Sequence, residues 1–112
     1  MGIKIESLKS CELITLSGQI DSVTAPDLEE DLLDLIKAGK RNMVLNMKDL
    51  TFVSSAGMGV LMSTQIKVRR RIPKGRVVLS EVPDALRDTF ELVGMHHLFE
   101  FYDRDVEAVG SF

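Results

Sequence analysis

Short apolar runs alternate with helix-spaced segments along the chain, and this alternation limits the fold more than any other feature. The first two runs follow each other across the polar link Lys9–Ser10, which indicates a hairpin. The strand-like runs are residues 3–8, 11–18, 42–47, 76–80 and 97–103. The helical segments are residues 24–38, 55–71, 83–94 and 104–109. The order β-β-α-β-α-β-α-β-α predicts an α/β fold with a mixed sheet and packed helices.

The first helical segment carries signals at both of its ends. Thr24 is placed to cap the helix, Pro26 is tolerated in its first turn, and Asp27 occupies the position of a capping-box acid. Gly39 is well placed to end this helix at its C-terminus. Gly18, earlier in the chain, is predicted to end the second strand. The residues spaced as one buried face are Leu28, Leu32, Leu35 and Ile36.

Size, charge and cysteine content exclude several classes of protein. A chain of 112 residues is predicted to be one domain, and its net charge of −3 argues against nucleic acid as a partner. The six basic residues between Lys67 and Arg76 are interpreted as a solvated face. The single cysteine, Cys11, rules out an internal disulfide and a cysteine zinc cluster. No motif indicates another group, and we expect neither metal nor cofactor. No apolar run approaches the roughly 20 residues that span a bilayer, so we expect no membrane insertion. Without a targeting segment we expect the cytoplasm, and we favour a monomer.

The stretch Leu50–Met62, LTFVSSAGMGVLM, joins a strand end, two serines and the start of a helical pattern. Sites in parallel sheets lie at the carboxyl ends of strands, which makes this corner the main candidate for function. A serine here can simply cap the helix. The alternatives are a catalytic nucleophile, a phosphate-binding loop and a serine that itself receives a phosphate.

The glycine pattern disfavours the first two alternatives. Neither serine has the glycine two residues earlier that a nucleophile elbow requires, and the Gly-Lys-Ser/Thr ending of a nucleotide cradle is missing. We therefore expect no catalytic residue. A phosphoserine fits better, because a helix N-terminus offers free amides and the positive end of a dipole. The small neighbours Ala56, Gly57 and Gly59 would keep the hydroxyl accessible to another protein.

Residues 45–61, LNMKDLTFVSSAGMGVL, resemble the signature of STAS domains, specifically that of the bacterial anti-sigma factor antagonists. Residues 16–36 resemble the family's Gly-x-Leu/Ile-Asp turn and first helix, and residues 82–103 resemble its C-terminal region. The resemblance covers nearly the whole chain in the right order. It implies a single STAS domain over residues 1–112 with the element order given above.

The resemblance also implies a function, which is partner switching without catalysis. In that family the unphosphorylated antagonist binds an anti-sigma factor, itself a serine kinase of the histidine-kinase-like ATPase class, and so releases the sigma factor. The kinase phosphorylates the antagonist, which weakens the complex, and a PP2C-like phosphatase reverses the step. The phosphoacceptor position falls on Ser55, and Ser54 replaces the family's acidic residue, which makes it a possible second acceptor.

Asp21 and one arc of the second helix complete the candidate site. The family's turn aspartate falls on Asp21, which would position the serine or meet the kinase, unless it only bonds its own turn. At about 100° per residue, one stripe of the helix is predicted to face the core: Gly57, Val60, Leu61, Thr64, Val68 and Ile72. The neighbouring arc either contacts the partner or widens the core: Ser55, Met58, Met62, Ile66 and Arg69. The partner-binding residues are thus expected to be Asp21, Ser54, Ser55, Gly57, Met58, Met62, Ile66 and Arg69.

Two other functions remain open at this point. A STAS domain can be an interaction module of another assembly, such as a stressosome-like or chemoreceptor-linked scaffold or a transporter-associated complex. In those cases the serine could be a cap only. A serine hydrolase would need a base within hydrogen-bond reach of Ser55.

Overall fold

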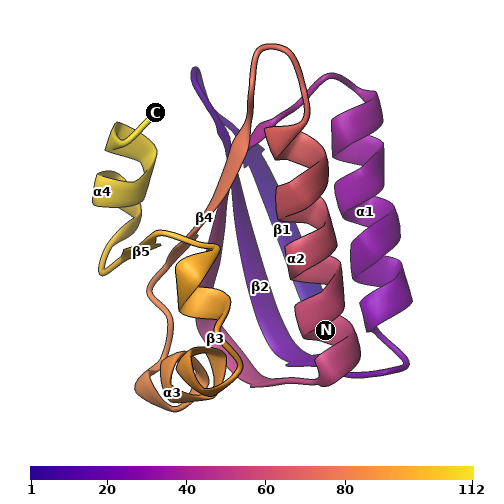
Figure 1. Cartoon of the computed structure of the whole chain (residues 1–112), viewed down its shortest axis with the longest axis vertical. Coiled ribbons are helices and arrows are strands. Elements are labelled where there is room, and N and C mark those ends of the chain that lie inside the picture. The colour runs from indigo at the N-terminus through magenta and orange to yellow at the C-terminus, as the bar shows by residue number, and fades with distance from the viewer.

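The computed structural model describes residues 1–112 and contains five strands, four α-helices and one 3₁₀ turn (Figure 1). The strands are β1 (Gly2–Ser7), β2 (Glu12–Ile20), β3 (Asn42–Val53), β4 (Arg76–Ser80) and β5 (Phe101–Tyr102). The helices are α1 (Ala25–Lys37), α2 (Ser55–Arg69), α3 (Asp84–Leu92) and α4 (Asp105–Gly110), and the 3₁₀ turn is Met95–His97. The predicted order of strands and helices is confirmed.

The five strands form one mixed sheet in the order β1-β2-β3-β4-β5. β1 pairs antiparallel with β2, as the predicted hairpin requires, and the pairs β2–β3, β3–β4 and β4–β5 are parallel. The α/β class with one antiparallel hairpin is therefore confirmed. The carboxyl ends of β2 and β3 meet at the same edge, where Ile20 pairs with Val53.

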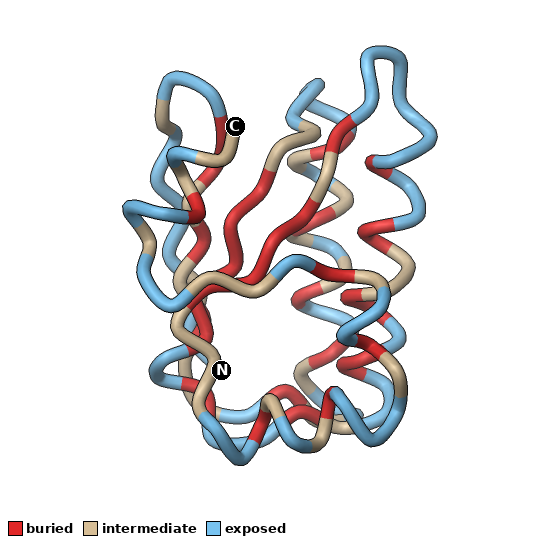
Figure 2. The backbone as a smooth tube through the Cα atoms, turned by 60° about the vertical axis from the view of Figure 1, so that its left-hand side comes forward, coloured by how far each residue is buried: buried red, intermediate tan, exposed pale blue.

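The sheet is covered on both faces, and the central strands are the most deeply buried segments (Figure 2). α1 and α2 lie side by side against one face, while α4 lies against the other (Figure 1). In β3, Met43, Leu45 and Met47 join the large core under α1 and α2, whereas Val44 joins a smaller cluster with Cys11 and Ala108. This alternation explains why the run at 42–47 is apolar at nearly every position. None of the helices combines the length and the apolar character needed to cross a membrane.

The strand boundaries differ from prediction in three places. Gly18 does not end β2 but lies within it, with φ of +84° and an irregular register to β3, as expected of a β-bulge glycine. β3 continues through Lys48 to Val53, because the segment before the serines also pairs with β2. The predicted strand at 97–103 is shorter in the structure. His97 belongs to the 3₁₀ turn, and β5 contains only Phe101 and Tyr102.

Two predictions for the helices are wrong. Thr24 precedes α1 but makes no side-chain cap; its hydroxyl instead donates to the Gln19 carbonyl at 3.0 Å. Ile72 was placed on the core stripe by carrying the helical spacing one residue past the predicted end at 71, but α2 ends at Arg69 and Ile72 is 98% exposed. Once the helix ends, its periodicity no longer determines which way a side chain points.

Candidate functional site

The candidate site is the corner where β3 turns into α2, beside the end of β2. The Ser54 backbone N–H donates to the Ile20 carbonyl at 2.7 Å, so the β2–β3 pairing continues to the first residue after β3. Asp21 follows Ile20 directly. Two loops that are far apart in the sequence are therefore held together at the carboxyl edge of the sheet, as predicted.

Ser54 is the N-cap of α2. Its backbone is extended, with φ of −76° and ψ of 171°, and its side-chain oxygen accepts a hydrogen bond from the Gly57 N–H at 3.1 Å. The Ser54 carbonyl accepts a further bond from the Met58 N–H at 2.9 Å. The capping role predicted for a serine at this corner is confirmed, and it belongs to Ser54.

Ser55 is the first helical residue, and its environment is different. It is exposed, and its hydroxyl makes no hydrogen bond within the protein. The N–H groups of Ser55 and Ala56 lie in the first turn, where they have no partner inside the helix. The first turn also contains no acidic residue, so nothing there offsets the positive end of the helix dipole. Ser55 thus combines a free hydroxyl with a local preference for negative charge.

The two glycines of the corner have opposite surroundings. Gly57 is buried, and a Cβ atom added there would lie 2.7 Å from Ile20 Cγ2 and 3.0 Å from Val53 Cγ1. Only a glycine lets α2 begin this close to the ends of β2 and β3. Gly59 is exposed, and a Cβ atom there would meet nothing within 4 Å. Gly57 therefore acts in packing, while Gly59, four residues after Ser55, keeps the surface beside Ser55 low.

Asp21 shapes the β2–α1 turn. Its Oδ1 atom accepts hydrogen bonds from the N–H groups of Val23 and Thr24, at 2.9 and 3.0 Å, and lies 3.2 Å from the Thr24 hydroxyl oxygen, whose one proton it shares with the Gln19 carbonyl. The backbone bonds from Thr24 and Val23 hold the pKa of the Asp21 carboxyl below its ordinary value, because they favour the charged form. The structure thus shows that Asp21 bonds its own turn, while contact of Asp21 with a partner kinase stays a prediction. No hydrogen bond joins its carboxylate to either serine.

The proposed partner arc of α2 is only partly exposed. Met58 is 8% exposed and belongs to the main core, so for this residue the alternative in which the arc widens the core is confirmed and the partner contact is not. Met62 is half-buried and packs against that core. Ile66 is 45% exposed and Arg69 is exposed. Contact with a partner stays a prediction for Met62, Ile66 and Arg69.

Two exposed apolar side chains near the corner were not identified as site residues from the sequence. Val23, two residues after Asp21, is 77% exposed, and Phe52, two residues before Ser54, is 47% exposed. Phe52 and Val53 are consecutive residues of β3, and successive side chains of a strand alternate between the two faces of the sheet. Phe52 therefore points to the face opposite Val53. An apolar residue at an alternating outward position of a strand was the available signal.

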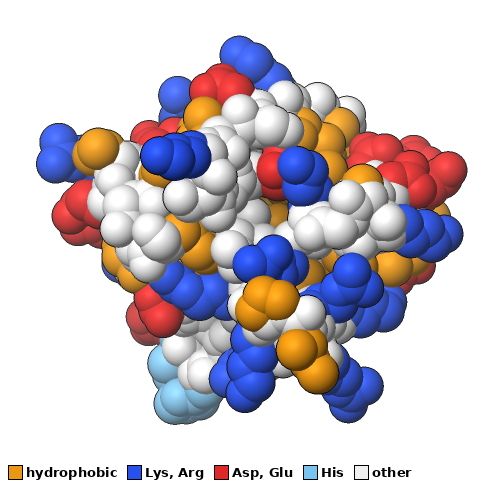
Figure 3. Space-filling model, turned by 90° about the horizontal axis from the view of Figure 1, so that it is seen from above, with side chains coloured by type: hydrophobic (Ala, Val, Ile, Leu, Met, Phe, Trp, Pro, Cys, Tyr) orange, Lys and Arg blue, Asp and Glu red, His pale blue; other side chains and the backbone are white.

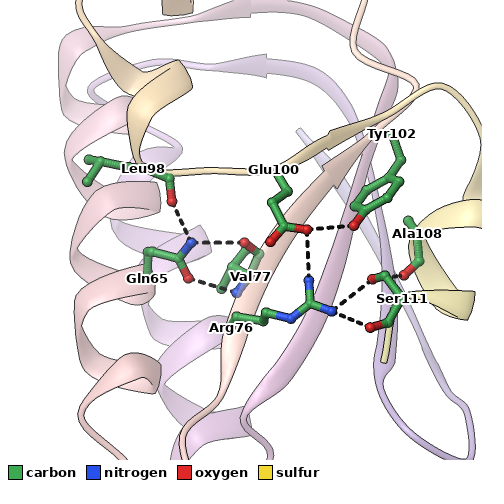
Figure 4. A network of polar contacts seen from close by, with 8 residues as sticks. All are labelled: Gln65, Arg76, Val77, Leu98, Glu100, Tyr102, Ala108 and Ser111. Carbon is green, nitrogen blue, oxygen red and sulfur yellow. Dashed lines mark hydrogen bonds and ion pairs between the residues drawn. The ribbon is translucent and has the colours of Figure 1, made fainter.

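Buried polar side chains also escaped the sequence interpretation. The Gln65 amide donates to the carbonyls of Val77 and Leu98 and accepts from the Val77 N–H (Figure 4). The two-residue β5 pairs only with Leu79 and Ser80 of β4 and does not reach Val77. The Gln65 amide therefore bonds the Val77 backbone in place of a neighbouring strand. Gln65 borders a cavity of about 510 Å³ at the end of the molecule opposite the serines.

A second polar network joins β3 to the C-terminal helix. The buried Asn46 amide donates to Glu81 Oε2 at 3.0 Å and to Asp105 Oδ1 at 2.9 Å. Ser80 donates to the same Asp105 oxygen at 2.6 Å. No group of three or more His, Cys, Asp or Glu side chains is arranged to hold a metal ion. We read the Asn46 network as structural.

Comparison with known proteins identifies the family. The protein-family model of the STAS domain matches residues 3–108 of this chain. The chain belongs to the STAS domain family. The resemblance seen in the sequence and the STAS fold are therefore confirmed.

The relatives of this STAS domain include regulators of sigma factors. BtrV, a candidate anti-sigma factor antagonist of Bordetella bronchiseptica, is 27% identical over 112 residues, which cover 100% of this chain and 95% of BtrV. The anti-sigma-B factor antagonist of Staphylococcus aureus is 28% identical over 85 residues, covering 76% of this chain and 77% of that protein. The Bacillus cell fate determinant SpoIIAA, solved in its phosphorylated form, has the same fold, with a TM-score of 0.75, 19% identity and 98% of each chain covered.

Proposed function

We propose that this STAS domain is an anti-sigma factor antagonist whose binding is switched by phosphorylation of Ser55. The observation that carries the proposal is the difference between the two serines of the corner. Ser54 caps α2, whereas Ser55 is exposed with a free hydroxyl. The names of its sequence relatives support the general role. The same fold in a protein solved in a phosphorylated form supports the modification.

A phosphate on Ser55 suits the local electrostatics. It would carry about −1.5 to −2 charges. The free N–H groups of Ser55 and Ala56 and the positive end of α2 would stabilise that charge, so the fold can remain intact. A partner seated on the corner would be repelled by the new charge, or would have to strip water from it at a cost in free energy. The modification would therefore weaken binding rather than unfold the domain.

The proposed partners are an anti-sigma factor that is also a serine kinase, and a phosphatase of the PP2C-like class. In the kinase step the Ser55 oxygen attacks the γ-phosphorus of ATP, ADP leaves, and the kinase accepts the hydroxyl proton. In the reverse step water replaces the serine oxygen and inorganic phosphate leaves. The chain itself supplies the acceptor and the docking surface around it, with no catalytic group.

Phosphopeptide mass spectrometry after incubation with ATP and the kinase tests the acceptor. We expect one phosphate on Ser55 in the wild type and in Ser54→Ala, and none in Ser55→Ala. Absence of phosphate from Ser55 in the wild type, or an unchanged phosphate content in Ser55→Ala, would reject Ser55 as the acceptor. Ser54→Ala is the matched control, because it removes the neighbouring hydroxyl of the same type.

A further inference from the structure

The loop between α2 and β4 carries the strongest concentration of positive charge in the protein. Six Lys and Arg residues lie between positions 67 and 76, and no Asp or Glu occurs from Leu50 to Ser80. Arg76 is paired with Glu100 at 3.2 Å. By contrast, none of the salt bridges involves the other five cations of this stretch, which are all exposed: Lys67, Arg69, Arg70, Arg71 and Lys74.

The loop projects from a fixed base. The Gly75 N–H donates to the Val68 carbonyl at 2.9 Å, which closes a loop that runs from Arg69, the last residue of α2, to Lys74. Gly75 is buried against the start of β3, where a Cβ atom would lie 2.1 Å from the Arg41 carbonyl oxygen. In Figure 1 this loop is the highest point of the molecule. These contacts at its base fix where the loop leaves the body of the protein.

Ile72 stands near the middle of that excursion and is 98% exposed, the highest value among the large apolar residues that are exposed. Seen from above, hydrophobic atoms on this end are surrounded by Lys and Arg side chains (Figure 3). Arg69 and Lys74 also border the cavity of about 510 Å³, which gives a phosphate group a recess beside the loop. The tip therefore combines an apolar point with a ring of cations that have no ion-pair partner.

We infer that this loop docks the protein on the surface of an anionic lipid membrane. The cations would face lipid phosphates, and Ile72 would enter the boundary between headgroups and acyl chains. A bilayer can accept an isolated aliphatic side chain without a matching pocket. A protein partner would have to supply such a pocket. Nucleic acid fits less well, since residues 67–76 include no aromatic side chain for base stacking.

The placement of the loop has a consequence for the orientation of the docked protein. The 15 residues of α2 span about 22 Å between Ser55 and the loop. A protein docked through Ile72 would thus present the serine corner away from the bilayer. This inference is independent of the function proposed for Ser55, because a failure of either one leaves the other standing.

Vesicle co-sedimentation tests the inference. The full chain is mixed with vesicles of phosphatidylcholine alone, or of phosphatidylcholine and phosphatidylglycerol in equal parts. We expect binding only to the anionic vesicles, and loss of that binding at high salt. The double change Arg70→Gln and Arg71→Gln should weaken binding about 25-fold, about fivefold for each cation.

The apolar tip has its own variant and a matched control. Ile72→Ser should weaken binding at least about tenfold without changing the melting temperature, because the side chain is solvated in the free protein. Leu92→Ser makes a similar apolar-to-polar change at a residue that is 88% exposed on α3, and should leave binding unchanged. Equal binding to both kinds of vesicle would overturn the inference. So would wild-type binding by Ile72→Ser, or a preference for short duplex DNA over anionic vesicles.

Discussion

The Ser54 side-chain oxygen accepts a hydrogen bond from the Gly57 N–H at 3.1 Å. This bond assigns different work to two adjacent serines, since Ser54 is committed to the helix cap and Ser55 is left with a free hydroxyl. Capping and modification are therefore separable by mutation.

Stability should distinguish the two serines. Ser54→Ala removes the cap and should lower the free energy of unfolding by about 1 kcal/mol. Ser55→Ala removes an exposed group without partners and should change it by less than about 0.5 kcal/mol. Urea unfolding of both variants measures the difference. Equal losses for the two serines would contradict the assignment of the cap.

The glycines of the corner provide a second paired test. Gly57→Ala should destabilise by about 1–3 kcal/mol, because its methyl group would overlap Ile20 and Val53. Gly59→Ala should stabilise by about 0.5–1 kcal/mol, since alanine favours the helix and space is open there. Thermal and urea unfolding check both signs. Destabilisation by Gly59→Ala would show that the helix surface is more crowded than the structure indicates.

The Gln65 amide should be required for stability. Gln65→Leu would leave the buried Val77 N–H and carbonyl without their side-chain partner, at a cost of about 1–3 kcal/mol. The matched control Gln19→Leu replaces an exposed glutamine and should stay within about 0.5 kcal/mol of the wild type. Denaturant unfolding compares the two. A Gln65→Leu protein as stable as Gln19→Leu would contradict the role of this network.

Asp21 should contribute a pH-dependent part of the stability. Its pKa is lower in the folded state, so its contribution is present above the pKa of the unfolded chain, about 3.9, and is lost as the pH falls through the folded value. The melting temperatures of wild type and Asp21→Asn should therefore converge on acidification. Other carboxylates titrate in both proteins and cancel in the comparison. A constant difference between the two melting curves at every pH would contradict this prediction.

The sequence predicted the order of the elements because strand and helix periodicities are local properties. Leu28, Leu32 and Ile36 were correctly placed on the buried face of α1, since a regular helix carries its phase over several turns. The serine corner was also found, because a strand end, small residues and a helical pattern meet there in consecutive positions. These features depend on residues near one another in the chain.

The failures concern features that depend on distant contacts. The exposed Ile72 was misplaced, and the sequence could not decide between core and surface for Met58, because the end of α2 and its rotation are fixed by packing on the sheet. Thr24 was expected to cap a helix, yet its hydroxyl bonds a carbonyl of β2. Gln65 was missed because its partners lie on β4 and on the segment before β5. Single-sequence patterns do not contain such pairings.

The affinity of the chain for its anti-sigma factor, measured before and after phosphorylation, tests the central claim most directly. Isothermal titration should compare the unmodified chain, the chain phosphorylated on Ser55, and Ser55→Ala treated with the same kinase and ATP. We expect the phosphorylated chain to bind at least about tenfold more weakly, a loss of about 1.4 kcal/mol, and the treated Ser55→Ala variant to keep the unmodified affinity. Equal affinity with and without the phosphate on Ser55 would contradict the switch.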